Sequence, residues 1–191
     1  NIQACSHENI YALCDIDDRE IAQTLREDWA GAFRSKTKTY RDYREMLSEE
    51  PEIDALIIST PDHMHTPIAS SAMDLGKHLY IEKPLCHTVA EARFLARRAK
   101  ETNIVSQMGN QGHTHEGLRY IKEWTQAGVI GDVVEVLHWT NRPIWPQGEI
   151  ARRNVPVPAT LDYDLWLGVA PKKPFDDKIV KVTAYGSTWL K

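Results

Sequence analysis

The chain has 191 residues, 42% of them hydrophobic and 26% charged, a balance typical of globular proteins that bury a core. This length fits one domain, or one domain and part of a second. The net charge is −4 and the basic residues form no patch or tail, so no nucleic-acid partner is expected. No apolar run approaches the ~20 residues that cross a bilayer, so no membrane partner is expected either.

Cysteine chemistry and targeting signals add little. Cys5, Cys14 and Cys86 are too few for a disulfide framework and form no C-x-x-C pair. The chain begins at Asn1 with neither Met nor a secretion signal, so its start reads as cut. Localisation, cytoplasmic or exported, is therefore left open.

The first third of the chain reads as strand, helix, helix, strand. Residues 10–14 form an apolar run that predicts a buried strand ending at Asp15. Asp17 or Asp18 can cap a following helix, and a shorter helix ends before Pro51. Residues 55–58 are apolar on both faces, as in a strand covered on both sides. The inward positions expected for the two helices are Ile21, Leu25, Trp29, Tyr43, Met46 and Leu47.

The next third repeats the alternation. Thr66 as N-cap and Pro67 at the first helical position predict a helix closed by Gly76. A strand over 78–81 follows, and Thr88 with Glu91 predicts a capping box at the next helix. A strand over 104–108 comes next. A last helix, ending near Gly128, is expected to turn Leu118, Ile121 and Trp124 inward.

This alternation predicts an α/β fold with a Rossmann-like, doubly wound parallel sheet over residues 1–130. The regular alternation of strands and helices ends after Gly131. A longer strand over 133–140 carries Glu135 and His138, and a proline-rich stretch follows from Pro143 to Pro158. Residues 131–191 are therefore expected to be the beginning of a second, α+β domain.

Polar or turn-forming residues follow four of the predicted strands. They are Asp15, the segment 59–63, Glu82-Lys83-Pro84, and the segment 109–113. Because ligands of open parallel sheets bind beyond the carboxyl ends of the strands, these loops are expected to share one edge and form a site. The alternative is ordinary loop chemistry at each strand end.

Asp15 is the candidate ribose ligand. A carboxylate at the end of the second strand of a dinucleotide fold accepts hydrogen bonds from the ribose hydroxyls, and its charge disfavours a 2′-phosphate. NAD is therefore expected rather than NADP. The glycine loop of the fingerprint belongs about 20 residues earlier, before Asn1, and Gly31 is the first glycine. The alternative is that Asp15 only begins a turn.

Lys83 is the candidate proton-transfer group. A lysine at a strand end, partly desolvated and beside a positively charged nicotinamide, can exchange a proton with a substrate hydroxyl. Glu82 could steer its ammonium group. Taken alone, an exposed Glu-Lys-Pro is more often a solvated turn.

Several motifs together resemble the Gfo/Idh/MocA family of oxidoreductases, over about residues 1–170. They are Ala-Leu-Cys-Asp at 12–15, Ile-Ser-Thr-Pro-Asp-His-Met-His at 58–65 and Gly-Lys-His-Leu-Tyr-Ile-Glu-Lys-Pro-Leu at 76–85. Gly-Asn-Gln-Gly-His at 109–113 and Asn-Arg-Pro-Ile-Trp-Pro-Gln-Gly at 141–148 are similar to a bacterial subgroup. Asp62 stands where many members have Asn.

The resemblance implies an NAD-dependent oxidoreductase that acts at a sugar or polyol hydroxyl. It implies a catalytic set of Lys83, Glu82 and His113. It implies a cofactor-binding set of Asp15, Thr60, Pro61, His63, His65, Glu82, Lys83, Pro84, Asn110, Gln111, Arg142 and Trp145, with no metal. Arg142 and Trp145 would reach the cofactor or sugar from the second domain.

The resemblance also limits what this chain is expected to do alone. The family's glycine loop and most of its second domain do not match, and neither does the tail 171–191. The isolated chain is therefore expected to bind NAD weakly and to turn over poorly or not at all. The full-length parent is expected to be a homo-oligomer.

Two other functions remain open. The first is a metal-dependent hydrolase, because His63 with His65 and His113 with His115 form His-x-His pairs that would share a face in a strand. The second is a non-catalytic, nucleotide-binding remnant. NAD-assisted cleavage of a glycoside without net redox is a further variant of the dehydrogenase reading.

Overall fold

The computed structural model describes residues 2–139 and 154–177. The described helices and strands are η1 (Ile2–Cys5), β1 (Ala12–Cys14), α1 (Asp18–Arg26), η2 (Asp28–Ala32), β2 (Lys38–Tyr40), α2 (Tyr43–Glu49), β3 (Ala55–Ile58), α3 (Asp62–Asp74), β4 (His78–Ile81), α4 (Val89–Thr102), β5 (Ser106–Met108), η3 (Gln111–Thr114), α5 (Glu116–Gln126) and α6 (Tyr163–Leu167).

All strand pairs are parallel, as the strand–helix alternation predicts, so the α/β class is confirmed. The strands form two hydrogen-bonded sheets, β1-β2 and β3-β4-β5, rather than the single sheet expected from the sequence. Within the described residues β1 and β3 are not paired, so the sheet is interrupted between them. In the second sheet the register aligns Ile58 with Ile81 and Ile81 with Met108.

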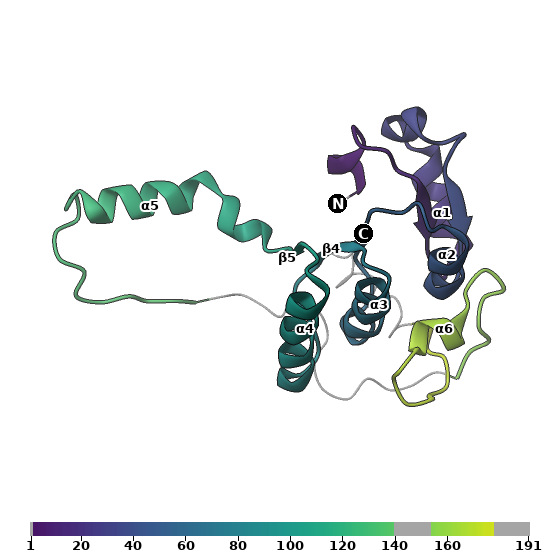
Figure 1. The fold of residues 1–191 in the computed structure, drawn as a ribbon. Coiled ribbons are helices and arrows are strands. Elements are labelled where there is room, and N and C mark those ends of the chain that lie inside the picture. Colours follow the sequence, from purple (N-terminus) through teal and green to yellow (C-terminus); the bar gives the residue numbers. More distant parts are fainter. Residues whose placement is uncertain (1, 140–153, 178–191) are drawn as a thin grey trace.

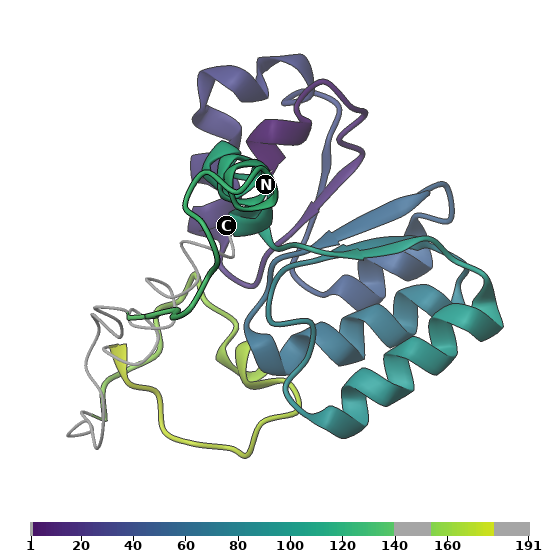
Figure 2. The ribbon, with the colours of Figure 1, turned by 90° about the vertical axis from the view of Figure 1, so that its left-hand side faces the viewer.

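Two helices cover one face of the β3-β4-β5 sheet. Figure 2 shows α3 and α4 side by side below these strands, and both pack on each other. The alternation of the strands fits this arrangement, because Leu56 and Ile58 of β3 are buried whereas Ile57 is 43% exposed. The prediction that residues 55–58 are covered on both faces is therefore wrong for the described part of the chain. Leu79 and Ile81 of β4 join the same core, together with residues of α2, α3 and α4.

The start of α3 differs from the sequence prediction. The helix begins at Asp62, directly after Pro61 as N-cap, and Pro67 lies inside it. The prediction of a Thr66 N-cap is therefore wrong, and His63 and His65 belong to a helix and not to a strand end. Pro61 holds φ at −56°, which suits entry into a helix. Pro67, in the second turn of α3, removes one backbone hydrogen-bond donor from the helix.

Other caps follow the sequence closely. The side chain of Asp17 accepts a hydrogen bond from the backbone N–H of Arg19 at the start of α1. The Thr88–Glu91 capping box is present in full at α4, which ends at Asn103 in the left-handed conformation. These local signals are confirmed because they depend on residues within one helical turn of each other.

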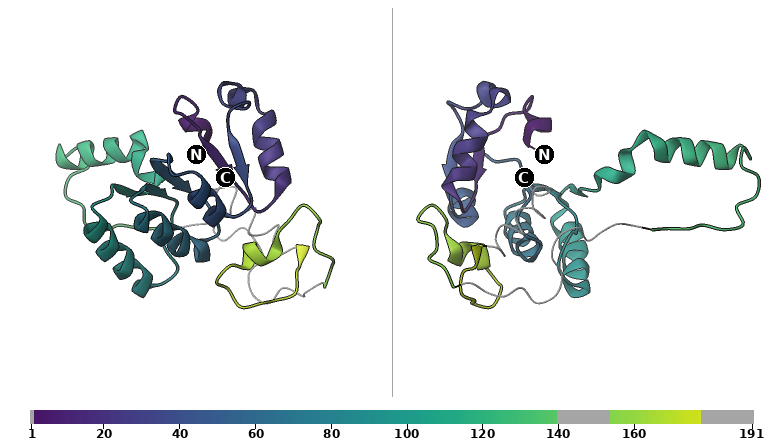
Figure 3. Two further views of the ribbon diagram at one scale, coloured as in Figure 1. Left: turned by 45° about the vertical axis from the view of Figure 1, so that its right-hand side comes forward. Right: turned by 180° about the vertical axis from the view of Figure 1, so that it is seen from behind.

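The segment after β5 departs from the prediction. Helix α5 projects away from both sheets (Figure 1; Figure 3, right), and its expected inward residues Leu118, Ile121 and Trp124 are 46%, 60% and 54% exposed. Residues 133–139 form no strand, so the strand predicted over 133–140 is wrong for its described part. An apolar pattern gives a strand only where a second strand supplies hydrogen-bond partners.

The segment 158–177 packs against the loop after β1 and against helix α3. Leu161 forms an isolated antiparallel bridge with Asp17 after β1, and the N–H of Asp162 donates to the carbonyl of Ile16 at 2.9 Å. On the other side, Trp166 lies against His63 of α3 with ring centroids 5.8 Å apart. Tyr163, Phe175 and the buried Asp176 complete this unit.

A bilayer-spanning helix, which would have to be long and apolar, is not found in the described part of the chain.

Candidate functional site

The carboxyl ends of β3, β4 and β5 meet at one edge of the sheet. The N–H of Glu82 donates to the carbonyl of Ile58 at 2.9 Å, and the N–H of Gly109 donates to the carbonyl of Ile81 at 2.7 Å. These bonds continue the parallel register beyond the strands. Of the four polar segments predicted to share an edge, those at 59–63, 82–84 and 109–113 therefore do so. Asp15 follows β1, which belongs to the other hydrogen-bonded sheet.

Glu82 is the buried carboxylate of this edge. It is 0% exposed, and the side-chain amide of Gln111 donates to its Oε1 at 2.5 Å. This contact joins the loop after β4 to the loop after β5. Burial and the charge of Glu82 raise the pKa of Tyr80, which lies beside it.

Gly109 makes that cluster possible. A Cβ at this position would lie 2.8 Å from the hydroxyl of Tyr80 and 3.0 Å from Oε1 of Glu82. Only a residue without a side chain leaves both groups where they are. The requirement here is close approach and not an unusual backbone conformation.

His65 joins the loops after β3 and β4. It is 0% exposed. Its Nδ1 lies 2.7 Å from the carbonyl oxygen of Pro84, and its Nε2 lies 2.8 Å from the carbonyl oxygen of Thr60. The Thr-Pro loop and the Glu-Lys-Pro turn are thus held together by one side chain. Lys83 lies between the buried Glu82 and the tethered Pro84, is itself half-buried, and precedes a cis peptide bond.

Asp15 follows β1 in the other sheet. Its N–H donates to the carbonyl of Tyr40 at 3.1 Å, and its Oδ1 accepts from the N–H of Asp17 at 2.9 Å. The side chain therefore takes part in the turn before α1, as the simpler reading of the sequence holds. A role of this carboxylate towards ribose stays a prediction.

The remaining predicted residues are spread more widely. Pro61 caps α3, and Nε2 of His63 lies 3.0 Å from the carbonyl oxygen of Trp166. Asn110 and His113 are exposed beyond β5, where the N–H of His113 donates to the carbonyl of Asn110 at 3.0 Å. Arg142 and Trp145 lie outside the described residues.

The hydrolase alternative loses the geometric premise of its first histidine pair, His63 with His65. His63 and His65 lie in a helix, where residues two apart do not share a face, and both ring nitrogens of His65 face backbone carbonyls. Within residues 2–139 and 154–177 no three His, Cys, Asp or Glu side chains gather into a metal-binding group.

The edge offers groups that fit a dinucleotide. Within the described chain the buried hydroxyl oxygen of Thr60 has no hydrogen-bond partner, which leaves it available to a ligand at the end of β3. Lys83 stands at the end of the neighbouring strand, and Asp15 ends β1. Such groups, placed at the carboxyl ends of parallel strands, suit a dinucleotide. A glycine-rich phosphate loop is not among the residues of this edge.

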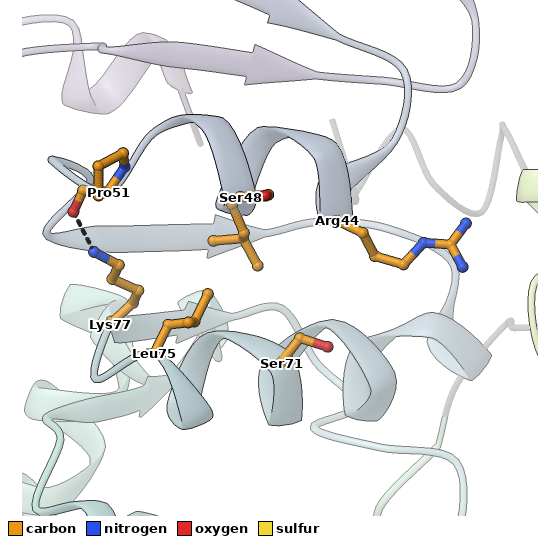
Figure 4. A pocket seen from close by; sticks show the side chains of 7 residues that line it. Arg44, Ser48, Pro51, Ser71, Leu75 and Lys77 are labelled. Atoms are coloured by element: carbon orange, nitrogen blue, oxygen red, sulfur yellow. Dashed lines mark hydrogen bonds between the residues drawn. The ribbon is translucent and has the colours of Figure 1, made fainter.

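The cavity shown in Figure 4 lies elsewhere. It is an open depression of about 540 Å³ between α2 and the end of α3, lined by Arg44, Leu47, Ser48, Pro51, Ser71, Leu75 and Lys77. The ammonium group of Lys77 donates to the carbonyl of Pro51 at 2.6 Å. Pro51 and Lys77 precede β3 and β4, so the depression lies at the amino ends of the strands, away from Lys83.

Sequence reasoning missed three parts of this site. It assigned no role to Tyr80, to Gly109 as a close-approach glycine, or to the docking of Trp166. A glycine directly after a predicted strand was a usable signal for the second of these. The contacts of His65 with Thr60 and Pro84 join residues up to 19 positions apart, which no local pattern encodes.

Comparisons with known proteins point in one direction. A family model described as an oxidoreductase family with an NAD-binding Rossmann fold matches residues 2–110. A second, described as the C-terminal alpha/beta domain of the oxidoreductase family, matches residues 118–189. The expectation that the tail 171–191 does not match the family is therefore wrong for residues 171–189.

Individual relatives agree with these matches. Levoglucosan dehydrogenase of Pseudarthrobacter phenanthrenivorans is 31% identical over 49% of this chain and 24% of that protein. Glycosyl hydrolase family 109 protein 1 of a Shewanella species, strain ANA-3, is 32% identical over 69% of this chain and 30% of its own length. The crystal structure of myo-inositol 2-dehydrogenase from Lactobacillus plantarum superposes with a TM-score of 0.55 at 28% identity, covering 65% of this chain and 35% of that one. The chain thus spans less than half of each of these proteins.

Proposed function

Since this chain belongs to the Gfo/Idh/MocA oxidoreductase family, with its NAD-binding Rossmann fold, we propose that the protein carrying it transfers a hydride between NAD and a hydroxyl-bearing carbon of a sugar or polyol. The observation that supports this most is the position of Lys83. It follows β4 at the shared carboxyl edge, between the buried Glu82 and Pro84, whose carbonyl faces His65. The backbone of Lys83 is thus held between a buried residue and a hydrogen-bonded one.

In the proposed reaction NAD, when bound, accepts the hydride from the substrate carbon. Lys83 accepts the proton of the reacting hydroxyl, and returns it in the reverse direction. Glu82 precedes Lys83 at the end of β4, and its bond to Gln111 fixes the carboxylate. Thr60 and Asp15 are proposed to hold the cofactor at the ends of β3 and β1.

The other predicted residues complete the proposal. Pro61, His63, His65 and Pro84 shape the wall of the cofactor site, and Asn110 and Gln111 line it next to the nicotinamide. His113 would face the substrate. Arg142 and Trp145 would reach the cofactor or the sugar from the second domain, whose proposed boundary lies near residue 130.

The names of the relatives support a carbohydrate or polyol substrate. One acts on levoglucosan and one on myo-inositol, both ring compounds with several secondary hydroxyl groups. We propose the same substrate class for the protein that carries this chain. We also propose that this protein assembles as a homo-oligomer.

The test is Lys83→Ala in the protein that carries this chain, with Lys100→Ala on the exposed face of α4 as the matched control. NADH formation is followed at 340 nm with a panel of sugars and inositols, and NAD affinity is measured by calorimetry. Lys83→Ala is expected to lower kcat by about 10²-fold or more, the contribution of a positioned acid–base group, while NAD affinity stays within error. Wild-type turnover in Lys83→Ala would show that the assignment is wrong.

A second candidate has one supporting observation. The relative that covers 69% of this chain is named a glycosyl hydrolase, so cleavage of a glycoside with no net change in NAD is the alternative outcome. Incubation with aryl glycosides separates the two, because release of the aryl group without NADH accumulation supports cleavage. Accumulation of NADH with a free sugar supports the dehydrogenase.

A further inference from the structure

His65 has an environment that constrains its protonation. Both of its ring nitrogens lie at hydrogen-bond distance from a backbone carbonyl oxygen, 2.7 Å from Pro84 and 2.8 Å from Thr60. A carbonyl oxygen can only accept a hydrogen bond. Neutral imidazole has one N–H and one lone pair, so in that form one of the two contacts would set a lone pair against a carbonyl oxygen. Both contacts are hydrogen bonds only when both nitrogens carry a proton.

The two carbonyls belong to different loops. Thr60 lies in the turn between β3 and α3, and Pro84 follows Lys83 in the turn after β4. His65 is fully buried, so water does not replace either bond when it is lost. A buried carbonyl without a donor is destabilising, and hydrogen bonds from a charged donor are stronger than neutral ones.

We propose that His65 is a positioning residue for Lys83 and that it acts in the doubly protonated form, as a tether between the Thr60 turn and the Lys83-Pro84 turn. The assignment of Lys83 to proton transfer belongs to the proposed function, on which this inference rests. The tether involves only residues of this chain and does not depend on the role of Lys83 in catalysis.

The proposed tether depends on pH. The tether is intact when the pH is low enough for both ring protons to be present. It loses one bond when a rise in pH removes one of them, and the Lys83-Pro84 turn then gains freedom. A catalytic lysine would therefore lose its placement on the alkaline side of the transition.

Several ionisable groups surround α3. Those on its own helix are Asp62, His63 and Asp74, and those on β4 and the turn after it are His78, Tyr80, Glu82, Lys83 and Cys86. The helices packed against α3 carry Tyr43, Arg44, Glu45 and Glu49 on α2 and Glu91, Arg93, Arg97, Arg98, Lys100 and Glu101 on α4, and the docked α6 carries Tyr163 and Asp164. Glu82 is the fully buried carboxylate among these groups.

The first test needs no substitution. The chain is labelled with ¹⁵N-histidine, and the ring of His65 is identified by its proximity to Thr60 and Pro84 in NOE spectra. Nitrogen shifts are then followed between about pH 5 and 8, the range in which histidine changes charge. Two protonated nitrogens with slowly exchanging N–H protons are expected at the acid end. A His65 ring with one unprotonated nitrogen throughout this range would overturn the proposal.

The second test measures the tether. His65→Gln is compared with His63→Gln, which removes a histidine two residues away whose described contact is to Trp166 instead. Loss of a charge-assisted bond is expected to raise amide exchange at Lys83 and Leu85 by about tenfold to a hundredfold in His65→Gln only. Acetylation of the Lys83 amine, read by mass spectrometry, is expected to rise towards that of exposed Lys100.

These readouts separate the two ideas. If His65→Gln leaves exchange and acetylation at Lys83 equal to those of His63→Gln, the tether is refuted whatever Lys83 does. If the tether is found but Lys83→Ala keeps full turnover in the protein that carries this chain, the proposed function fails and the tether stands. If His65→Gln does not fold, the pH series on the unsubstituted chain decides alone, since amide exchange at Lys83 and Leu85 must then rise together with loss of the ring proton.

Discussion

Replacing Gly109 with alanine tests the geometry of the candidate site most directly. The added Cβ would meet the Tyr80 hydroxyl at 2.8 Å and the Glu82 carboxylate at 3.0 Å. Neither can move easily, because the tyrosine ring is rigid and Glu82 is buried and bound to Gln111. Overpacking costs about 1–3 kcal/mol, and displacement of Glu82 from Gln111 adds the loss of a hydrogen bond to a charged group, about 1.5–3 kcal/mol. The two contributions together give an expected destabilisation of about 2.5–6 kcal/mol.

Urea unfolding followed by tryptophan fluorescence measures this value. Gly112→Ala is the matched control, because a Cβ there has nothing within 4 Å and should change the free energy of unfolding little. Tyr80→Phe removes the hydroxyl at 2.8 Å and should recover part of the loss when combined with Gly109→Ala, a coupling that a double-mutant cycle reveals. Equal unfolding free energies for the two glycine variants would refute the close approach at this edge.

Three further predictions concern other parts of the molecule. Gly168→Ala should loosen the packing of α6 on α3, because Gly168 has φ +51° and its Cβ would overlap the sulfur of Met64; faster amide exchange at Trp166 than in the unsubstituted chain is the readout. Glu50→Gln should lower stability at neutral pH, because hydrogen bonds from Lys38 and Tyr40 lower the pKa of this buried carboxyl. Its stabilisation exists above the unfolded-state pKa and is lost as pH falls through the lower folded-state pKa, so urea midpoints of the two proteins should converge in acid. Burial, with the charges of Asp15, Asp42 and Glu45, raises the pKa of Cys14 to about 12. Iodoacetamide at mildly alkaline pH should therefore alkylate Cys14 much more slowly in the folded chain than in urea. Equal alkylation rates in the two states would contradict this prediction.

The local signals of the sequence were reliable where their partners lie within one turn. The capping box of Thr88 and Glu91 and the apolar runs of β3 and β4 needed only neighbouring residues, and the structure has them. The start of α3 was misplaced because two prolines, Pro61 and Pro67, both suit a helix N-terminus. The chain uses the first, and the second is accommodated inside the helix.

Predictions that depended on residues distant in the sequence were wrong in several places. The apolar face of α5 was expected to be buried and residues 133–139 were expected to lie in a strand. In the structure both segments are exposed and the second is not a strand, because burial and strand pairing require a second surface that a one-dimensional pattern does not specify. The interruption between β1 and β3 has the same origin, since pairing is a property of two strands and not of either sequence alone.

The amino-acid sequence by itself determined the parallel α/β class, the family, and the presence of polar residues after each strand, because these follow from periodicity, capping and short motifs. The tertiary structure alone decided which of those residues meet. It joined Glu82 to Gln111 and His65 to both Thr60 and Pro84, and it left Asn110 and His113 exposed. The physical reason is that strand register and helix packing set distances between residues far apart in the chain, and hydrogen bonds form only where those distances close.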